Sequence, residues 1–223
     1  IAEFIRGQYN DLAAGEFARA YGNRRTAARE RVIPAEAWAA ANTMVPIPPA
    51  APVMFAAAID IGRTETVIAA CAVVDGLPMI EIVDRRPGTA WAADRISQLV
   101  ADHGAPPPLV DPIGPSGTLH DELVGRGLDL PPFTVRDLTR ACANFLDRVT
   151  HTDTNGDPDP TIAIRPNDGL DAAADIATTR RVGDAWAWQR DALGSLASLE
   201  AATLALHAAS HRPQAPTTPL IIV

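Results

Sequence analysis

Three short apolar runs decide the fold: VMFAAAID at 53–60, TVIAACAVVD at 66–75 and PMIEIVDR at 78–85. Each run has the length of a strand and is bounded by residues typical of turns. The Asp75-Gly76 pair between the second and third runs indicates a hairpin, because both residues tolerate the positive φ of a tight turn. The simplest interpretation is a meander of three antiparallel strands.

Beyond residue 88 the apolar residues change to helical spacing. TAWAADRISQLVADHG at 89–104 predicts a helix that ends at its glycine. PLVDP at 108–112 predicts a short buried strand, SGTLHDELVGRG at 116–127 a second helix, and FTVRDL at 133–138 the start of a further strand and helix. Alternation of strand and helix favours parallel additions to the sheet. The expected fold class is therefore α/β: a ribonuclease H-like mixed sheet, with three antiparallel strands and then parallel βαβ additions, flanked by helices.

The chain is expected to have one globular domain with an appendage at each end. Residues 1–50 are predicted to form a helical connecting arm that ends in a linker, because VPIPPAAPV at 45–53 contains four prolines and favours an extended backbone. Residues 51–212 are predicted to form the globular domain, and 213–223 a C-terminal tail.

Composition excludes some classes of function. All 19 basic residues are arginine, and a P-loop ATPase needs the lysine of its phosphate-binding motif. The net charge of −8 argues against a free-standing nucleic-acid binder, although metal-binding acids would explain part of it. Cys71 and Cys142 have no zinc-ligand spacing and are interpreted as buried thiols. No run is apolar enough to span a membrane, so a cytoplasmic protein is expected.

Two aspartates stand where apolar runs end. Asp60 closes AAAID and Asp111 closes PLVD, each before a loop that contains glycine. A buried carboxylate is unfavourable without a partner or a metal. Asp60 has a structural interpretation, a turn-capping residue before Gly62, and a functional one, a metal ligand. If the two strands are neighbours, both aspartates could bind metal ions about 3.5–4 Å apart, which is the geometry of two-metal phosphodiester hydrolysis.

Several blocks of the chain resemble the C-terminal nuclease domain of the large terminase subunit of tailed bacteriophages, especially the type found in phages of actinobacterial hosts. EFIRGQYN and FARAYGNR are similar to the stretch that follows the ATPase domain of that subunit. AAAIDIG, PLVDPIGPSGTLHDEL, RACANFLDRV, GDAWAWQR and LEAATLALHAA are similar to the successive nuclease blocks.

The resemblance implies a metal-dependent endonuclease that cuts double-stranded concatemeric DNA with two Mg²⁺ or Mn²⁺ ions. Asp60 and Asp111 match the first two acidic positions of the family. The third position belongs to the last helix, where this chain has Ser195. Asp191, about one helical turn earlier, is the preferred substitute, so that Asp60, Asp111 and Asp191 are the expected catalytic and metal-binding residues. Glu200, expected to point to a different face, and Asp184 are the other candidates.

The resemblance also implies partners: double-stranded DNA, a terminase ATPase domain, the portal and the small terminase subunit, in the cytoplasm of the infected bacterial host. Arg24 and Arg25, in the arm, are candidate DNA contacts. Two other functions stay open. The chain could be a catalytically weak or silent docking domain of the packaging motor, which the Ser195 departure favours. AIDIGRTETVIAA at 58–70 is also similar to the phosphate-binding turn of the actin and sugar-kinase superfamily.

Overall fold

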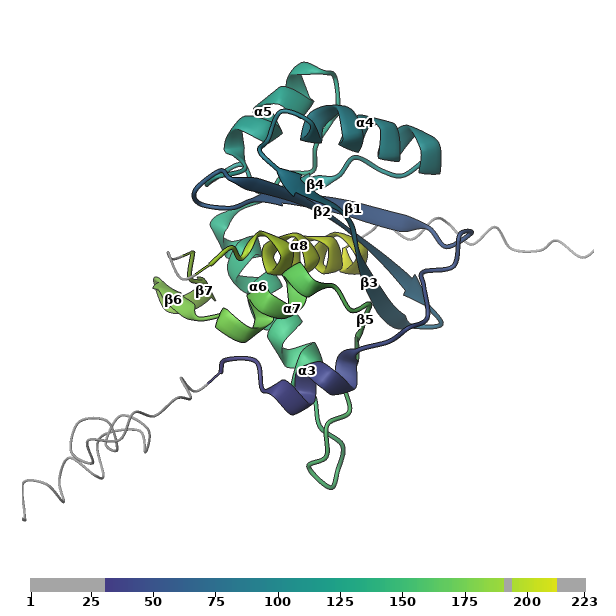
Figure 1. Cartoon of the computed structure of the whole chain (residues 1–223), viewed down its shortest axis with the longest axis vertical. Helices are drawn as coiled ribbons and strands as arrows, with labels where there is room; N and C mark the ends of the chain where they lie inside the picture. The colour runs from purple at the N-terminus through teal and green to yellow at the C-terminus, as the bar shows by residue number, and fades with distance from the viewer. Residues whose placement is uncertain (1–30, 191–193, 212–223) are drawn as a thin grey trace, which may run out of the picture. The chain divides into compact units, whose positions relative to one another are not determined.

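The computed structural model describes residues 31–190 and 194–211. The elements discussed below all belong to one compact unit, Ile33–Val223. Its centre is a five-stranded sheet with the order β4-β1-β2-β3-β5 (Figure 1). A separate two-stranded sheet joins β6 and β7.

The first three strands form the predicted antiparallel meander. They are β1 (Val53–Ile59), β2 (Glu65–Val74) and β3 (Leu77–Pro87). The turn between β2 and β3 consists of Asp75 and Gly76, with φ of 50° and 83°. The hairpin prediction is confirmed, since these are the two positions of a tight turn that require positive φ.

Two short strands extend this meander in parallel, one on each side. Strand β4 (Leu109–Val110) pairs with β1, and β5 (Ala163–Ile164) pairs with β3. The predicted mixed sheet is therefore confirmed.

One expected strand is not formed in the described part of the chain. In FTVRDL the backbone goes directly from Phe133 into helix α6 (Val135–Val149). Thr134 caps this helix, because its hydroxyl accepts the N–H of Asp137 while the Asp137 carboxylate accepts the N–H of Thr134. Pro131 and Pro132 just before it have no N–H to donate to a sheet.

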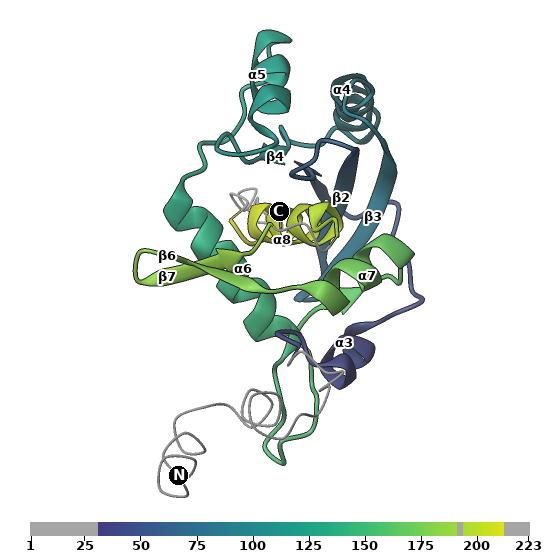
Figure 2. The same ribbon diagram turned by 60° about the vertical axis from the view of Figure 1, so that its left-hand side comes forward.

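Helices cover both faces of the sheet. Helices α4 (Ala92–His103) and α5 (Gly117–Gly125) lie on one face, and α8 (Ala197–Ser210) lies on the other (Figures 1 and 2). Helices α6 and α7 (Asp168–Ile176) pack against the side of α8 that faces away from the sheet. Residues of α8 are consequently buried on every side, which matches its nearly uniform apolar sequence.

Strand β1 divides its side chains between these two faces. Phe55, Ala57 and Ile59 belong to the core on the side of α4 and α5. Because side chains alternate along a strand, Ala56 and Ala58 face α8, which packs on β1 and β2. The small side chains on this second face let a helix approach the sheet closely.

The hairpin of β6 (Thr179–Val182) and β7 (Ala185–Trp188) leads the chain back to α8. Trp188 is buried and its Nε1–H donates to the hydroxyl of Thr203 in α8. Trp186 stacks edge-on against Trp188. The two tryptophans therefore contribute to packing between this hairpin and α8.

Residues before the proline-rich stretch also pack on the sheet domain. Trp38 of α3 (Ala35–Ala41) donates its indole N–H to Asp171, and Thr43 donates its N–H to the carbonyl of Ile164. The predicted boundary near residue 50 stays a prediction, but these contacts join both sides of it. Helices in the described ranges are all too short or too polar to cross a membrane.

Candidate active site

Asp60 follows β1 and accepts three hydrogen bonds from the turn that leads to β2. Its Oδ1 accepts the N–H of Glu65 at 2.7 Å. Its Oδ2 accepts the N–H of Gly62 at 3.0 Å and the hydroxyl of Thr64 at 3.1 Å. The turn-capping interpretation of Asp60 is therefore correct. The carboxylate of Asp60 can still bind a further partner, because its two oxygens offer about four lone-pair sites.

Asp111 follows β4 and is 3% exposed. Its Oδ1 accepts the N–H of Ile113 at 2.8 Å, and its Oδ2 accepts an N–H of Arg190 at 3.0 Å. Buried carboxylates need such partners, because desolvation without them is unfavourable.

The register of β1 and β4 brings the two aspartates to the same edge of the sheet. Ala56 pairs with Leu109 and Ala57 with Val110, so Asp111 comes next to Ala58 and Asp60 lies two residues further along. Alternation of side chains puts Ala58, Asp60 and Asp111 on one face. That face is the one covered by α8. The two strands that end at Asp60 and Asp111 are therefore neighbours, which is the condition for both aspartates to bind the same metal ions.

Three further hydrogen bonds join the segments that carry the aspartates. The N–H of Ile59 donates to the hydroxyl of Ser116, in the loop after β4, at 3.0 Å. Arg63, in the turn after β1, donates to the carbonyl of Pro115 at 2.5 Å and to the hydroxyl of Thr118 at 2.9 Å. The positions of the two loops are therefore coupled.

A third carboxylate reaches this site from α8. Glu200 lies in the first turn of α8 and is 6% exposed. Its Oε1 accepts the Nε–H of Arg190 at 2.5 Å, while the Nη2–H of the same guanidinium donates to Asp111. Arg190 thus binds Asp111 and Glu200 with neighbouring N–H groups of one planar fork, which keeps the two acceptor oxygens close together.

Burial and the neighbouring charges have opposing effects on the pKa of Glu200 and on the pKa of Arg190. Burial raises the pKa of Glu200 above its ordinary value, and the Arg190 charge opposes this shift. Burial alone would lower the pKa of Arg190, but the charges and hydrogen bonds of Glu200 and Asp111 outweigh it and raise that pKa. Arg190 is therefore a permanent cation inside an acidic site.

Gly114 gives Arg190 its space. A Cβ at this position would lie 2.5 Å from Nη1 of Arg190 and 3.5 Å from Oδ2 of Asp111. Gly114 also has a φ of 144°, which L side chains rarely adopt. The loop after β4 can follow this path past the guanidinium only with glycine.

The expected orientation of Glu200 needs a correction, whereas the selection of Asp191 as the third acid stays a prediction. Ser195 precedes α8, which begins at Ala197, so helical spacing counted from Ser195 does not apply to Glu200. Glu200 was expected to point to a different face, yet its carboxylate is joined to Asp111 through Arg190. Asp184, the other alternative, is in the turn of the β6–β7 hairpin, and its side chain is fully exposed. Asp191, like Arg24 and Arg25, lies outside the described residues.

Arg190 was missed by sequence reasoning, although a signal for its partner existed. Glu200 is the only charged residue in ASLEAATLALHAAS, the sequence of α8. An isolated acid in a buried apolar helix needs a cation or a metal, by the same reasoning that selected Asp60. Nothing in the sequence indicates that Arg190 supplies that cation.

The donor set fits a hard divalent cation. Asp60, Asp111 and Glu200 offer carboxylate oxygens, the ligands that Mg²⁺ and Mn²⁺ prefer. Within the described ranges, however, no three His, Cys, Asp or Glu residues are arranged so that they could hold an ion together. The guanidinium of Arg190 occupies the space between two of the three acids.

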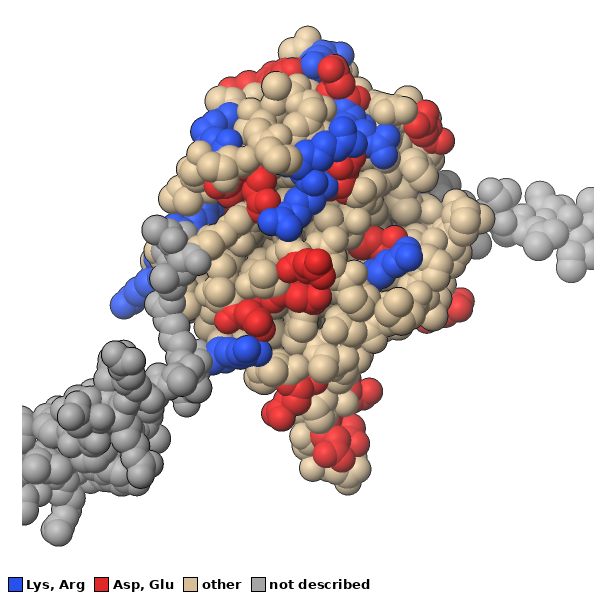
Figure 3. Space-filling view, viewed as in Figure 1, with Lys and Arg blue, Asp and Glu red and all other residues tan. Residues whose placement is uncertain are grey.

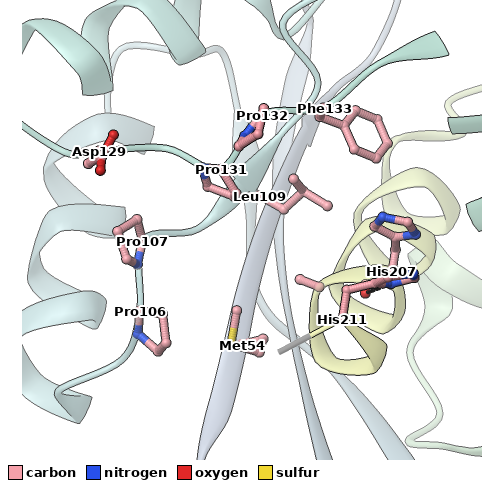
Figure 4. A pocket seen from close by; sticks show the side chains of 11 residues that line it. Met54, Pro106, Pro107, Leu109, Asp129, Pro131, Pro132, Phe133, His207 and His211 are labelled. Carbon is pink, nitrogen blue, oxygen red and sulfur yellow. Dashed lines mark hydrogen bonds between the residues drawn. The ribbon is translucent and has the colours of Figure 1, made fainter. Parts of the chain in front are cut away.

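An apolar pocket lies elsewhere on the α8 side of the sheet. Figure 4 shows His207 and His211 of the α8 end facing Leu109, Met54 and the prolines of two loops. Its volume is about 240 Å³. Met54 and Asp60 are at opposite ends of β1, and none of the three acids lines the pocket. This pocket is therefore separate from the candidate active site.

Charges elsewhere on the surface are mixed. Figure 3 shows basic and acidic side chains interspersed on one face, with acidic ones at the loop that projects between α6 and β5. In this loop Asp153 accepts the N–H groups of Asn155 and Asp157, so its carboxylate closes a turn.

Solved structures that are similar to this chain include large terminases of phages and a nuclease domain of one of them. The large terminase nuclease of thermophilic phage G20c has a TM-score of 0.52 and 16% identity over 71% of this chain and 82% of that chain. The HK97 bacteriophage large terminase has a TM-score of 0.56 and 14% identity over 92% of this chain and 49% of that chain. A mutant of gp2c of the large terminase subunit from bacteriophage sf6, solved with calcium, has a TM-score of 0.50 and 16% identity over 82% of this chain and 100% of that chain.

These similarities confirm the ribonuclease H-like fold. At such identities they show the fold and leave the activity to be argued from the site. No protein-family model matches the chain, and no curated protein matches it by sequence.

Proposed function

We propose that this chain is the nuclease domain of a large terminase from a tailed bacteriophage, of the actinobacterial phage type, and that it cuts double-stranded concatemeric DNA with two Mg²⁺ or Mn²⁺ ions. The observation that carries the proposal is the placement of Asp60 and Asp111. They follow adjacent parallel strands, on one face of a sheet whose fold is that of terminase nucleases. Calcium in the sf6 protein supports a preference for hard cations.

Asp60 and Asp111 would hold the ions, which when bound supply an activated water and stabilise the leaving oxygen. Both carboxylates are already oriented by the chain. Asp60 is fixed by the turn that it caps, and Asp111 by the N–H of Ile113. Rigid support of this kind matters, because ligands must hold their geometry as the reaction proceeds.

Glu200 and Asp191 are the two candidates for the third metal ligand. Glu200 is favoured by its contact with the guanidinium that Asp111 also binds. Asp191 is adjacent to Arg190 in the chain and keeps its place as the alternative. Replacing each by its amide distinguishes them: the variant that loses cleavage as completely as Asp60→Asn identifies the ligand, because ligands that act as one unit show non-additive losses.

DNA and the other motor components are the proposed partners. Double-stranded DNA would approach the edge of the sheet where Asp60 and Asp111 lie, and Arg24 and Arg25 would contact it from the preceding segment. We further propose that a terminase ATPase domain, the portal and the small terminase subunit act with this domain in the cytoplasm of the infected host. The chain spans about half of the HK97 large terminase, in agreement with a part of a larger motor protein.

Cleavage of a supercoiled plasmid tests the function. With Mn²⁺ the wild-type chain should nick and linearise the plasmid, while Asp60→Asn and Asp111→Asn should lose at least about a hundredfold in rate, because each removes a charged ligand from a unit. Asp121→Asn is the matched control, since the Asp121 side chain is 85% exposed on α5. Excess chelator should abolish cutting by the wild type.

A silent docking domain is the alternative outcome. It is favoured by the ion pairs of Arg190, whose guanidinium binds two of the three acids in the structure. A folded wild-type chain that leaves plasmid intact across Mg²⁺ and Mn²⁺ concentrations would support that function and overturn the nuclease proposal.

A further inference from the structure

The strongest unexplained feature of the site is the guanidinium between two acids. Arg190 is 15% exposed, and its partners Asp111 and Glu200 are 5% and 7% exposed at their side chains. The ion pair therefore lies below the surface, where charges are screened weakly by solvent. Burial of three charges together requires that each be compensated by the others.

The guanidinium of Arg190 binds one oxygen of Asp111 and one oxygen of Glu200. Nη2 binds the Oδ2 of Asp111, while the Oδ1 of Asp111 is engaged by the N–H of Ile113. Nε binds the Oε1 of Glu200. An ion bound by Asp111 and Glu200 would therefore compete with the guanidinium for both carboxylates.

Gly114 presents only backbone to Nη1 of Arg190. Among the described residues, the guanidinium of Arg190 forms ion pairs with Asp111 and Glu200.

We infer that Arg190 occupies the place of a cation between Asp111 and Glu200, so that metal binding proceeds by exchange of the guanidinium for the ion. This inference rests on the proposed function and adds a positioning residue to it. In the metal-free chain Arg190 compensates the acids and keeps the first turn of α8 against the loop after β4. The apparent affinity for the metal is therefore proportional to the fraction of molecules in which the guanidinium has left the site.

Binding of Mn²⁺ to the folded chain, measured by calorimetric titration, tests the exchange. Arg190→Gln should bind Mn²⁺ at least about tenfold more tightly than the wild type, because the ion no longer competes with a bound cation. Arg148→Gln is the matched control. Arg148 is a partly buried arginine that donates to Asn144 and to the carbonyl of Thr161, away from the three acids, so its loss should leave metal affinity unchanged.

Thermal unfolding supplies a readout that does not depend on cleavage. Without metal, Arg190→Gln should melt below the wild type, since Glu200 and Asp111 are then buried without a cation. Added Mn²⁺ should narrow this difference, because the ion takes over the role of the guanidinium. Arg148→Gln should keep its difference from the wild type at every Mn²⁺ concentration. If Arg190→Gln fails to fold, Arg190→Lys, which keeps the charge without the fork, should show tighter binding than the wild type by a smaller factor.

The outcomes separate this inference from the proposed function. Wild-type binding of Mn²⁺ that Asp60→Asn abolishes and Arg190→Gln or Arg190→Lys leaves unchanged or weakens would overturn the exchange and leave the nuclease proposal intact. A wild-type chain that binds no Mn²⁺ at millimolar concentration would overturn both.

Discussion

Three acidic residues in apolar surroundings show how this chain accommodates buried charge. Asp60 is compensated by hydrogen bonds from its own turn, and Glu200 by one arginine. Asp111 combines both solutions. A backbone N–H cannot leave the site, whereas a side-chain cation can be displaced. Asp60 is therefore held in one position by the backbone, whereas the surroundings of Glu200 depend on whether Arg190 or another cation is bound to it.

Gly114 leaves the space that the guanidinium of Arg190 occupies. Gly114→Ala should lower the free energy of unfolding by about 1–3 kcal/mol, because a Cβ would meet the guanidinium and the backbone φ is strained for alanine. Urea unfolding followed by circular dichroism measures this change.

Gly125→Ala provides the control for glycine replacement. Gly125 ends α5, and a Cβ there meets nothing within 4 Å. Alanine in a helix is more favourable than glycine, so this variant should be unchanged or more stable by up to about 1 kcal/mol. A Gly114→Ala variant as stable as Gly125→Ala would contradict the assignment of Gly114 as a spacer for Arg190.

Among the elements, α6 and α8 illustrate two ways of being stable. Helix α6 has one buried face and begins with a capping box at Thr134. Helix α8 has no side-chain cap and is buried on almost all sides, between the sheet and α6. Its stability therefore comes from packing, whereas the start of α6 depends on local hydrogen bonds.

Thr134→Ala should lower the free energy of unfolding by about 0.5–2 kcal/mol, since it removes the oxygen that accepts the N–H of Asp137. The pKa of Asp137, which the Thr134 hydroxyl holds below its ordinary value, should rise toward that value in the variant. Chemical denaturation gives the first quantity and NMR titration the second. Thr154→Ala, in the exposed loop between α6 and β5, should change neither.

At the scale of the whole molecule, the pocket beside α8 makes stability depend on pH. Burial lowers the pKa of His207 to about 4, and His211 adds to this, while Asp137 opposes it. His207 stacks on His211 with ring centroids 4.1 Å apart and contacts Phe133 edge-on. The folded chain therefore keeps His207 neutral at pH values where the unfolded chain protonates it.

The free energy of unfolding should decrease as pH falls from about 6.5, the ordinary histidine value, to about 4, because the unfolded state takes up the proton first in this range. His207→Gln should make the dependence shallower. Glu200, whose pKa is raised, acts in the opposite direction, so the difference between variant and wild type isolates His207. His151→Gln, at an exposed histidine, should retain the wild-type slope; equal slopes for all three chains would refute the assignment.

Local patterns in the sequence were sufficient for much of the fold. Apolar runs of strand length, the Asp75-Gly76 turn and the change to helical spacing after residue 88 predicted β1 to β4, α4 and α5 in order. The same patterns selected Asp60 and Asp111, because a carboxylate at the end of an apolar run is visible without any tertiary contact. These features depend on residues near each other in the chain, where periodicity and turn chemistry act.

Only the tertiary structure brought the rest of the site together. Arg190 and Asp111 are 79 residues apart, and their contact depends on the path of the β6–β7 hairpin and on where α8 begins. The placement of β5 beside β3, at the edge opposite β4, likewise depends on packing between distant elements. Buried charges are compensated by whichever partner the fold brings near them, and no local pattern encodes that partner. For this reason Asp60 and Asp111 could be selected from the sequence, whereas Arg190 and the orientation of Glu200 could not.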